Sequence, residues 1–232
     1  MAPLDTVAHI RSDFPTKFGI PRQSGLVKTL QAQVVFTKKY RRPEALRGLE
    51  HFSHIWLLWG FSQAAADEWS PTVRPPRLGG NARIGVFASR SPYRPNSIGL
   101  SCVKIDKIDL TPPDGPVIHV LGADLADGTP IYDIKPYLPY TDSHPDASGG
   151  FDPDPLAAPL QVRLDDRWLA GLPRESAETL RELLAGDPRP SYQQDPARVY
   201  GLEYKDLEVK FSVNGDTLTV LSIHPRAGRP DG

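Results

Sequence analysis

The 232-residue chain has room for one large domain, or for one of ordinary size and a small one, and its 25 prolines and 19 glycines argue against a bundle of long helices. Its single cysteine, Cys102, excludes an intramolecular disulfide and a cysteine-rich metal site, and is typical of a reducing compartment. The net charge of −1 hides an asymmetry, because residues 1–108 hold 16 Lys and Arg against 7 Asp and Glu, whereas residues 109–196 hold 6 against 16.

The N-terminus lacks the basic and apolar regions of a secretory signal. The longest apolar run, residues 55–61, is too short to cross a bilayer. We therefore expect a cytoplasmic protein with no membrane partner.

As far as residue 135, the chain is expected to form short strands, because apolar runs are separated by residues that fix or permit turns. The predicted strands are residues 7–11, 26–36, 52–61, 82–89, 98–110, 117–124 and 131–135. In the strand over 98–110 the apolar side shifts after Cys102, and such a shift predicts a bulge. Short strands at this spacing predict a mainly β fold with a small closed β-barrel.

Residues 140–158 are rich in Pro, Asp, Gly and Ser and lack periodicity. We place the domain boundary there, near residue 150. The prediction is a barrel domain over residues 1–150 and a small α+β domain over residues 151–232.

The second domain contains a helix and a hairpin. Residues 173–185 predict an amphipathic helix that Gly186 ends. Apolar residues alternate on both sides of Asn214-Gly215, and this pattern predicts a β-hairpin. The small domain would cover the barrel or position a substrate on it.

Arginine is concentrated between residues 74 and 94, where the chain has five Arg and no acidic residue. Guanidinium groups bind phosphates and stack on bases, and Pro and Gly hold such loops in fixed, exposed conformations. The segment therefore predicts an RNA-binding surface. The alternative is structural: the arginines would pack on Tyr93 or Phe87 and pair with the acidic middle of the chain.

Titratable and aromatic side chains gather over residues 124–140. If residues 131–135 are extended, Asp133 and Lys135 point the same way. Such a pair can orient an amine and accept its proton, or it can be an ordinary surface ion pair. The ring of Tyr137 could stack on a base or pack against the barrel.

A third segment, Gln23-Ser24-Gly25, offers backbone and side-chain hydrogen bonds to a small ligand. The chain contains neither a Walker loop nor a GxGxxG sequence, so a nucleoside triphosphatase and a Rossmann enzyme are unsupported. The histidines lack metal-ligand spacing, and we expect no metal site.

Long motifs are spread over most of the chain. They are KFGIPRQ (17–23), GLEHFSHIW (48–56), the whole block 74–100, DGTP (127–130), DIKPYLP (133–139) and DPRPSY (187–192). With these motifs the chain resembles the family of tRNA N6-threonylcarbamoyladenosine methyltransferases, which have TsaA-like barrels. The resemblance implies a homodimer whose barrel binds S-adenosylmethionine in a non-Rossmann manner. It also implies methyl transfer to N6 of the modified adenosine beside the anticodon of threonine tRNA.

The resemblance also assigns cofactor contacts to particular residues. They are Gln23, Ser24, Gly25, Phe61, Ser62, Arg90, Leu100, Gly128, Thr129, Pro130 and Ile131. The chain departs from the family pattern at Asp13, Ser24 and Ser97, where proline is usual, and at Ser62, where histidine is common. We expect the first three to loosen the backbone without destroying the site, and the last puts any role of that side chain in doubt.

On this interpretation catalysis consists of positioning and the removal of one proton. Asp133 is the candidate proton acceptor, Lys135 and Arg90 would orient substrate or cofactor, and Tyr137 would stack on the base. The candidate ligands of the anticodon-stem phosphates are Arg74, Arg77, Arg83 and Arg94. Two other functions fit the same residues: a non-catalytic RNA-binding barrel module, and a methyltransferase of small molecules or proteins on the same barrel.

Overall fold

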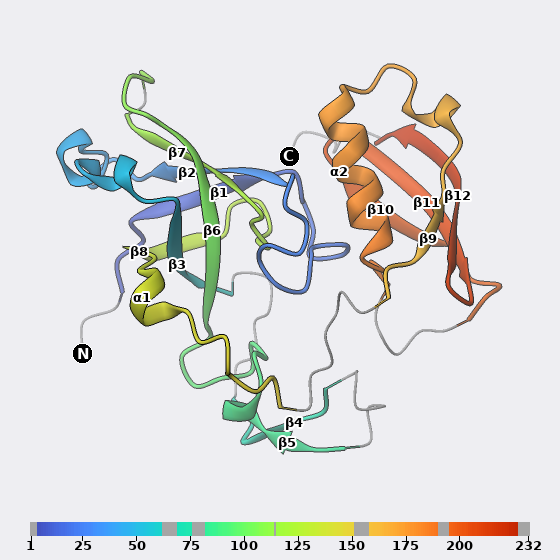
Figure 1. The fold of residues 1–232 in the computed structure, drawn as a ribbon, viewed down its shortest axis with the longest axis horizontal. Coiled ribbons are helices and arrows are strands. Elements are labelled where there is room, and N and C mark those ends of the chain that lie inside the picture. Colours follow the sequence, from blue (N-terminus) through green and yellow to red (C-terminus); the bar gives the residue numbers. More distant parts are fainter. Residues whose placement is uncertain are drawn as a thin grey trace, which may run out of the picture.

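A computed structural model of the chain describes residues 4–61, 69–75, 82–113, 115–150, 158–189 and 195–226. Figure 1 shows a barrel, a second sheet with a helix beside it, and a small two-stranded ribbon beneath them. Within these described ranges, no helix has the length and apolar character needed to span a bilayer.

Six strands form a closed barrel in the order β1, β2, β7, β6, β3, β8, and every neighbouring pair is antiparallel. The strands are β1 (Ala8–Ser12), β2 (Gln31–Phe36), β3 (His54–Gly60), β6 (Ile98–Asp109), β7 (Val117–Leu121) and β8 (Pro130–Pro136). Alternate residues face inward, where Ile10, Ile55 and Ile118 are fully buried. The predicted mainly β fold with a small closed barrel is confirmed.

Two of the predicted strands are wrong in extent. Residues 26–30 form turns, so the strand predicted over 26–36 begins only at Gln31. Of residues 82–89, only β5 (Ile84–Gly85) is extended, and it pairs with β4 (Thr72–Val73) outside the barrel. Val27 and Leu30 are buried although they lie outside a strand, and Val86 is buried in a 3-10 helix over Val86–Ala88, because burial does not require an extended backbone.

The predicted bulge in β6 is misplaced. The register of β6 against β7 shifts between Ile105 and Lys107, not after Cys102. The inward side of β6 carries the small residues Gly99 and Ser101, whereas Leu100 faces outward and is 50% exposed. Because small and polar residues occupy inward positions of β6, its apolar residues alone do not mark the inward side of the strand.

The C-terminal part is a four-stranded sheet in the order β10, β11, β12, β9, with β12 and β9 parallel. Its elements are β9 (Gln161–Arg163), α2 (Arg174–Ala185), β10 (Tyr200–Tyr204), β11 (Leu207–Asn214) and β12 (Thr217–Pro225), and a short helix α1 (Pro139–Asp142) follows the barrel. The predicted helix and hairpin are confirmed, with Gly186 as the C-cap of α2. Strands β9 and β10 were not predicted, although the alternation of Tyr200, Leu202 and Tyr204 is a signal for the second.

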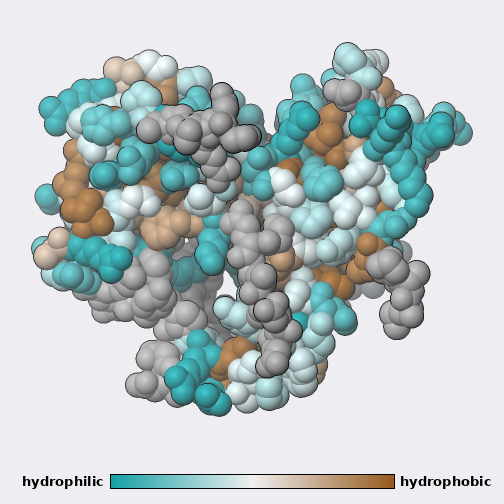
Figure 2. All heavy atoms as spheres, turned by 180° about the vertical axis from the view of Figure 1, so that it is seen from behind, coloured by the Kyte–Doolittle hydropathy of each residue, from teal (hydrophilic) through white to brown (hydrophobic). Residues whose placement is uncertain are grey.

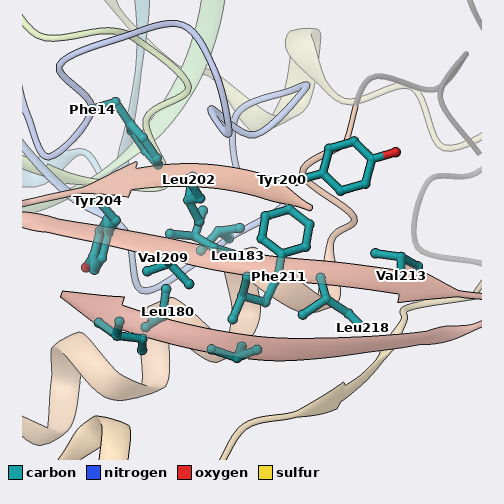
Figure 3. Packing of buried hydrophobic residues seen from close by; sticks show 14 of the residues in the cluster. Phe14, Leu180, Leu183, Tyr200, Leu202, Tyr204, Val209, Phe211, Val213 and Leu218 are labelled. Carbon is teal, nitrogen blue, oxygen red and sulfur yellow. The ribbon is translucent and has the colours of Figure 1, made fainter. Parts of the chain in front are cut away.

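The core of the C-terminal sheet is completed by the N-terminal segment 13–30, which precedes β2. Phe14, Val27 and Leu30 are buried in the same cluster as the apolar side of α2 and the sheet. Figure 3 shows Phe14 reaching from this segment onto the strands near Leu202 and Tyr204. The division into domains at residues 1–150 and 151–232 stays a proposal. Segment 13–30 packs against both proposed domains, because Phe14 lies in the core of the C-terminal sheet and Gly25 N donates to Gly122 O.

The surface of the molecule is largely polar on the face drawn in Figure 2, which shows two lobes with a notch between them. Hydrophobic residues gather there only in small, separate patches. Single exposed apolar side chains of this kind are normal on a folded protein.

Candidate functional site

Trp59, the last inward side chain of β3, lies at one end of the barrel. Its indole Nε1 donates to Ser101 Oγ at 2.9 Å, and its ring centroid is 4.4 Å from that of Phe61. The indole packs so closely on β6 that a Cβ at Gly99 would lie 2.3 Å from the ring. The two strands therefore fix the indole tightly at this end.

Asp124, just after β7, continues this hydrogen-bonded chain. Ser101 Oγ donates to Asp124 Oδ1 at 2.6 Å. Burial raises the pKa of the Asp124 carboxyl, although the bonds from Ser101 and the Ser24 N–H and the charge of Arg90 act the other way. The Asp124 carboxyl is thus largely buried, and the positive charge of Arg90 favours its ionised form.

The loop Gln23-Ser24-Gly25 belongs to segment 13–30, and its Ser24 N–H donates to Asp124. Arg90 donates to Gln23 Oε1. Ser24 Oγ accepts from Cys102 N at 3.1 Å, and Gly25 N donates to Gly122 O at 2.8 Å. We call Gln23, Ser24, Trp59, Phe61, Arg90, Ser101 and Asp124 the barrel-end cluster.

The turn before β8 lies next to this cluster. Gly128 has a φ of +77°, and its N–H donates to Ile10 O, which ties the turn to β1. Thr129 is buried, and Ile131 stands opposite Trp59 in the register of β8 and β3. The structure thus brings the turn over residues 128–131 to the same barrel end as the Gln23 loop.

Leu100, a predicted cofactor residue, stands apart from this grouping, because it neighbours Ser101 in β6 but faces outward. Ser62 lies outside the described residues. The cofactor roles of all these residues remain predictions.

Asp133 and Lys135 point the same way on the outer face of β8, and an ion pair of 2.9 Å joins Lys135 Nζ to Asp133 Oδ2. Tyr137, the next predicted residue, packs with its ring centroid 5.7 Å from that of Trp56. Asp133 lines a pocket of about 440 Å³ whose wall includes Tyr40 and Leu49. This volume is large enough for a nucleobase.

The single chain does not bring Asp133 into contact with the barrel-end cluster. Asp133 stands opposite Leu58 in β3, and Leu58 stands opposite Leu100 in β6. Two strand spacings therefore separate Asp133 from Leu100, which is roughly 10 Å. Trp59, a member of the cluster, follows Leu58 in β3 but points inward, so Asp133 and the cluster lie on opposite faces of the barrel wall.

The predicted phosphate ligands have different surroundings. Arg74 and Arg83 are exposed beside β4 and β5. Arg94 lies within its own loop, where Nη1 donates to Ser89 O at 2.6 Å and the guanidinium lies 5.7 Å from the Phe87 ring centroid. Arg77 lies outside the described residues. For Arg94 this geometry favours the structural alternative, whereas Arg74 and Arg83 have exposed side chains, and Arg83 Nη1 donates to Thr72 Oγ1 at 3.5 Å.

The three departures at which proline is usual each make a hydrogen bond in the structure. Ser24 hydrogen-bonds through its hydroxyl, and Ser97 Oγ donates to Pro92 O at 2.9 Å. Ser97 also has a φ of +41°, which a proline ring cannot adopt. Asp13 O accepts from Lys205 N of the C-terminal sheet at 2.9 Å.

Trp59, Ser101 and Asp124 were not singled out from the sequence. Ser101 carried a usable signal, because it is a polar residue at an inward position of a strand that alternates. The carboxylate of Asp124 finds its partners 23 residues earlier in the chain, at Ser101, and on the Ser24 loop. Such contacts are set by barrel closure and leave no local pattern.

The fold and site define a small closed-barrel protein with a polar, hydrogen-bonded cluster at one barrel end. A family model described as the tRNA-methyltransferase O N-terminal domain matches residues 9–143, and one described as the TrmO C-terminal domain matches residues 157–226. The chain therefore belongs to the tRNA-methyltransferase O family, and it is a methyltransferase of that family.

Individual relatives agree with this assignment. The tRNA (adenine(37)-N6)-methyltransferase of Escherichia coli is 40% identical over 230 residues, which cover 96% of this chain and 97% of that protein. A protein of the same name from Eikenella corrodens is 47% identical over 163 residues, covering 70% of this chain and 91% of that one. A crystal structure of TrmO from Pseudomonas aeruginosa superposes with a TM-score of 0.77 at 33% identity, covering 97% of this chain and 99% of that chain.

Proposed function

We propose that this chain methylates N6 of threonylcarbamoyladenosine at position 37 of threonine tRNA, as a cytoplasmic homodimer. The coarser activity, S-adenosylmethionine-dependent methylation of tRNA, is that of its family and named relatives. The meeting of the Gln23 loop, Arg90 and the turn over residues 128–131 at one barrel end supports a cofactor site, and the relatives named tRNA (adenine(37)-N6)-methyltransferase support adenosine 37 of tRNA as the substrate.

The residues at the barrel end fit S-adenosylmethionine as the cofactor. No described atom lies within 4 Å of the position that a Cβ would take at Gly25 or at Gly128, so the backbone there has room for a ligand. The Asp124 carboxylate suits a ligand that carries positive charge. When bound, S-adenosylmethionine supplies an electrophilic methyl group.

The chain's own residues supply positioning and proton removal. Gln23 and the backbone of Ser24 and Gly25 would hold the cofactor, with Arg90 beside them. N6 is a poor nucleophile because its lone pair is delocalised, so an acceptor for its proton should help. Asp133 takes that role in this proposal, Lys135 fixes its carboxylate at 2.9 Å, and Tyr137 would stack on the base.

The proposed function is tested by mass spectrometry of tRNA nucleosides from cells with and without this protein. We expect methylated threonylcarbamoyladenosine to disappear from threonine tRNA when the gene is deleted, and to return with the wild-type gene. Unchanged nucleosides in the deleted strain would contradict the proposal. Labelled methyl transfer to protein or metabolites, and not to tRNA, would favour the methyltransferase of other substrates.

Calorimetry separates the enzyme from a bare RNA-binding module. The wild-type protein is expected to bind S-adenosylmethionine with measurable heat and one site per chain, because the barrel end offers hydrogen bonds and a carboxylate to it. S-adenosylhomocysteine serves as the matched ligand without the positive sulfonium. A protein that binds tRNA but gives no heat with either compound would be the module.

Arg83→Ala is expected to weaken tRNA binding and to reduce the slope of log affinity against log salt by about 1, because one phosphate contact is lost. Titrations at several salt concentrations measure this slope. The control is Arg42→Ala, an exposed arginine just before the turn at Pro43–Leu46. An unchanged slope for Arg83→Ala would remove this residue from the RNA surface.

A further inference from the structure

The carboxyl group of Asp124 lies where several segments meet at the barrel end. Ser101 Oγ donates to it at 2.6 Å and in turn accepts from Trp59 Nε1 at 2.9 Å. The Ser24 N–H also donates to it, and the positive charge of Arg90, whose guanidinium donates to Gln23, acts to lower its pKa. Strands β3 and β6, the Gln23 loop and the Arg90 loop therefore share one acidic group.

A charged group in this position costs free energy of folding. Burial is the largest influence on Asp124 and raises its pKa, so at neutral pH the ionised carboxyl is less favourable here than in the unfolded chain. A neutral amide of the same size would fold at lower cost. A carboxylate retained at such a place is a candidate for a functional role.

Ser24 is held from two sides. Its N–H points to Asp124, and its hydroxyl accepts from Cys102 N at 3.1 Å. The next residue, Gly25, donates to Gly122 O at 2.8 Å. Asp124 is thus the acidic anchor of the loop at Ser24, whereas Gln23 accepts from the guanidinium of Arg90.

We infer that Asp124 is a positioning residue that holds the Gln23-Ser24-Gly25 loop and Arg90 in their binding arrangement before the cofactor arrives. A preformed loop does not have to be ordered on binding, and this raises affinity. The inference rests on the proposed function, because it takes the barrel end as the cofactor site. It predicts an effect on cofactor binding and not on the chemical step.

The test is Asp124→Asn, which keeps the size of the side chain but removes its charge and one acceptor. We expect the Kd and KM for S-adenosylmethionine to rise at least ~10-fold, equal to about 1.4 kcal/mol. At saturating cofactor, kcat should stay within about 3-fold of wild type, because the proton acceptor is elsewhere. The melting temperature should not fall, which separates this role from a purely structural one.

The matched control is Asp106→Asn, an exposed carboxylate farther along β6, for which wild-type binding is expected. Wild-type Kd and KM in Asp124→Asn, or a fall in kcat alone, would overturn the inference. If Asp124→Asn does not fold, Ser101→Ala replaces it, with the same direction expected and the same overturning result. A wild-type protein that does not bind S-adenosylmethionine overturns the proposed function as well, whereas an unaffected variant overturns only the inference.

Discussion

Asp133→Asn is expected to lower kcat for methyl transfer to threonine tRNA by at least ~100-fold, in the range that a general base contributes. The amide keeps the size of the side chain and can still accept from Ile134 N, which donates to Asp133 Oδ1 at 2.9 Å. It cannot take a proton from N6 at neutral pH. Single-turnover assays with saturating enzyme would measure the chemical step directly.

Cofactor binding provides the internal control for this variant. The Kd for S-adenosylmethionine should be unchanged, because Asp133 lies on the outer face of β8 and outside the barrel-end cluster, whose Trp59 points inward. Asp146→Asn, an exposed carboxylate beyond α1, should have wild-type activity. Wild-type turnover in Asp133→Asn would discard the assignment of the proton acceptor.

Phe14→Ala should lower the free energy of unfolding by about 3–5 kcal/mol, the usual cost of removing a fully buried phenyl ring. Phe14 is 0% exposed and lies in the core of the C-terminal sheet, although it belongs to the segment that leads to the Gln23 loop. The variant should therefore also bind S-adenosylmethionine more weakly. Urea denaturation and calorimetry would measure the two effects.

Phe87→Ala is the matched control for stability, because the Phe87 side chain is 73% exposed. It should change the free energy of unfolding by less than ~1 kcal/mol. A loss of unfolding free energy of similar size in both variants would contradict a stabilising role for the core that segment 13–30 shares with the C-terminal sheet. A destabilised Phe14→Ala protein with wild-type cofactor affinity would instead separate the C-terminal core from the Gln23 loop.

The sequence alone predicted the parts of the fold that depend on local pattern. Alternation and turn residues located β3, β6, β7 and β8 closely, and the Asn214-Gly215 turn located the hairpin of β11 and β12. The periodicity of two also placed Asp133 and Lys135 on one face, where they form an ion pair. Long motifs indicated the family, because such motifs can be recognised without any knowledge of contacts.

Only the tertiary structure decided which distant residues meet. The strand predicted over residues 82–89 became a short ribbon outside the barrel, and Phe14 joined a core that includes buried residues from Leu180 to Ile223, more than 150 residues later in the sequence. Ser101 and Asp124 became partners because barrel closure points both to the same end. Side-chain direction along a strand follows from local geometry, but which segments close on one another depends on the packing of the whole chain, and a single sequence does not display that packing.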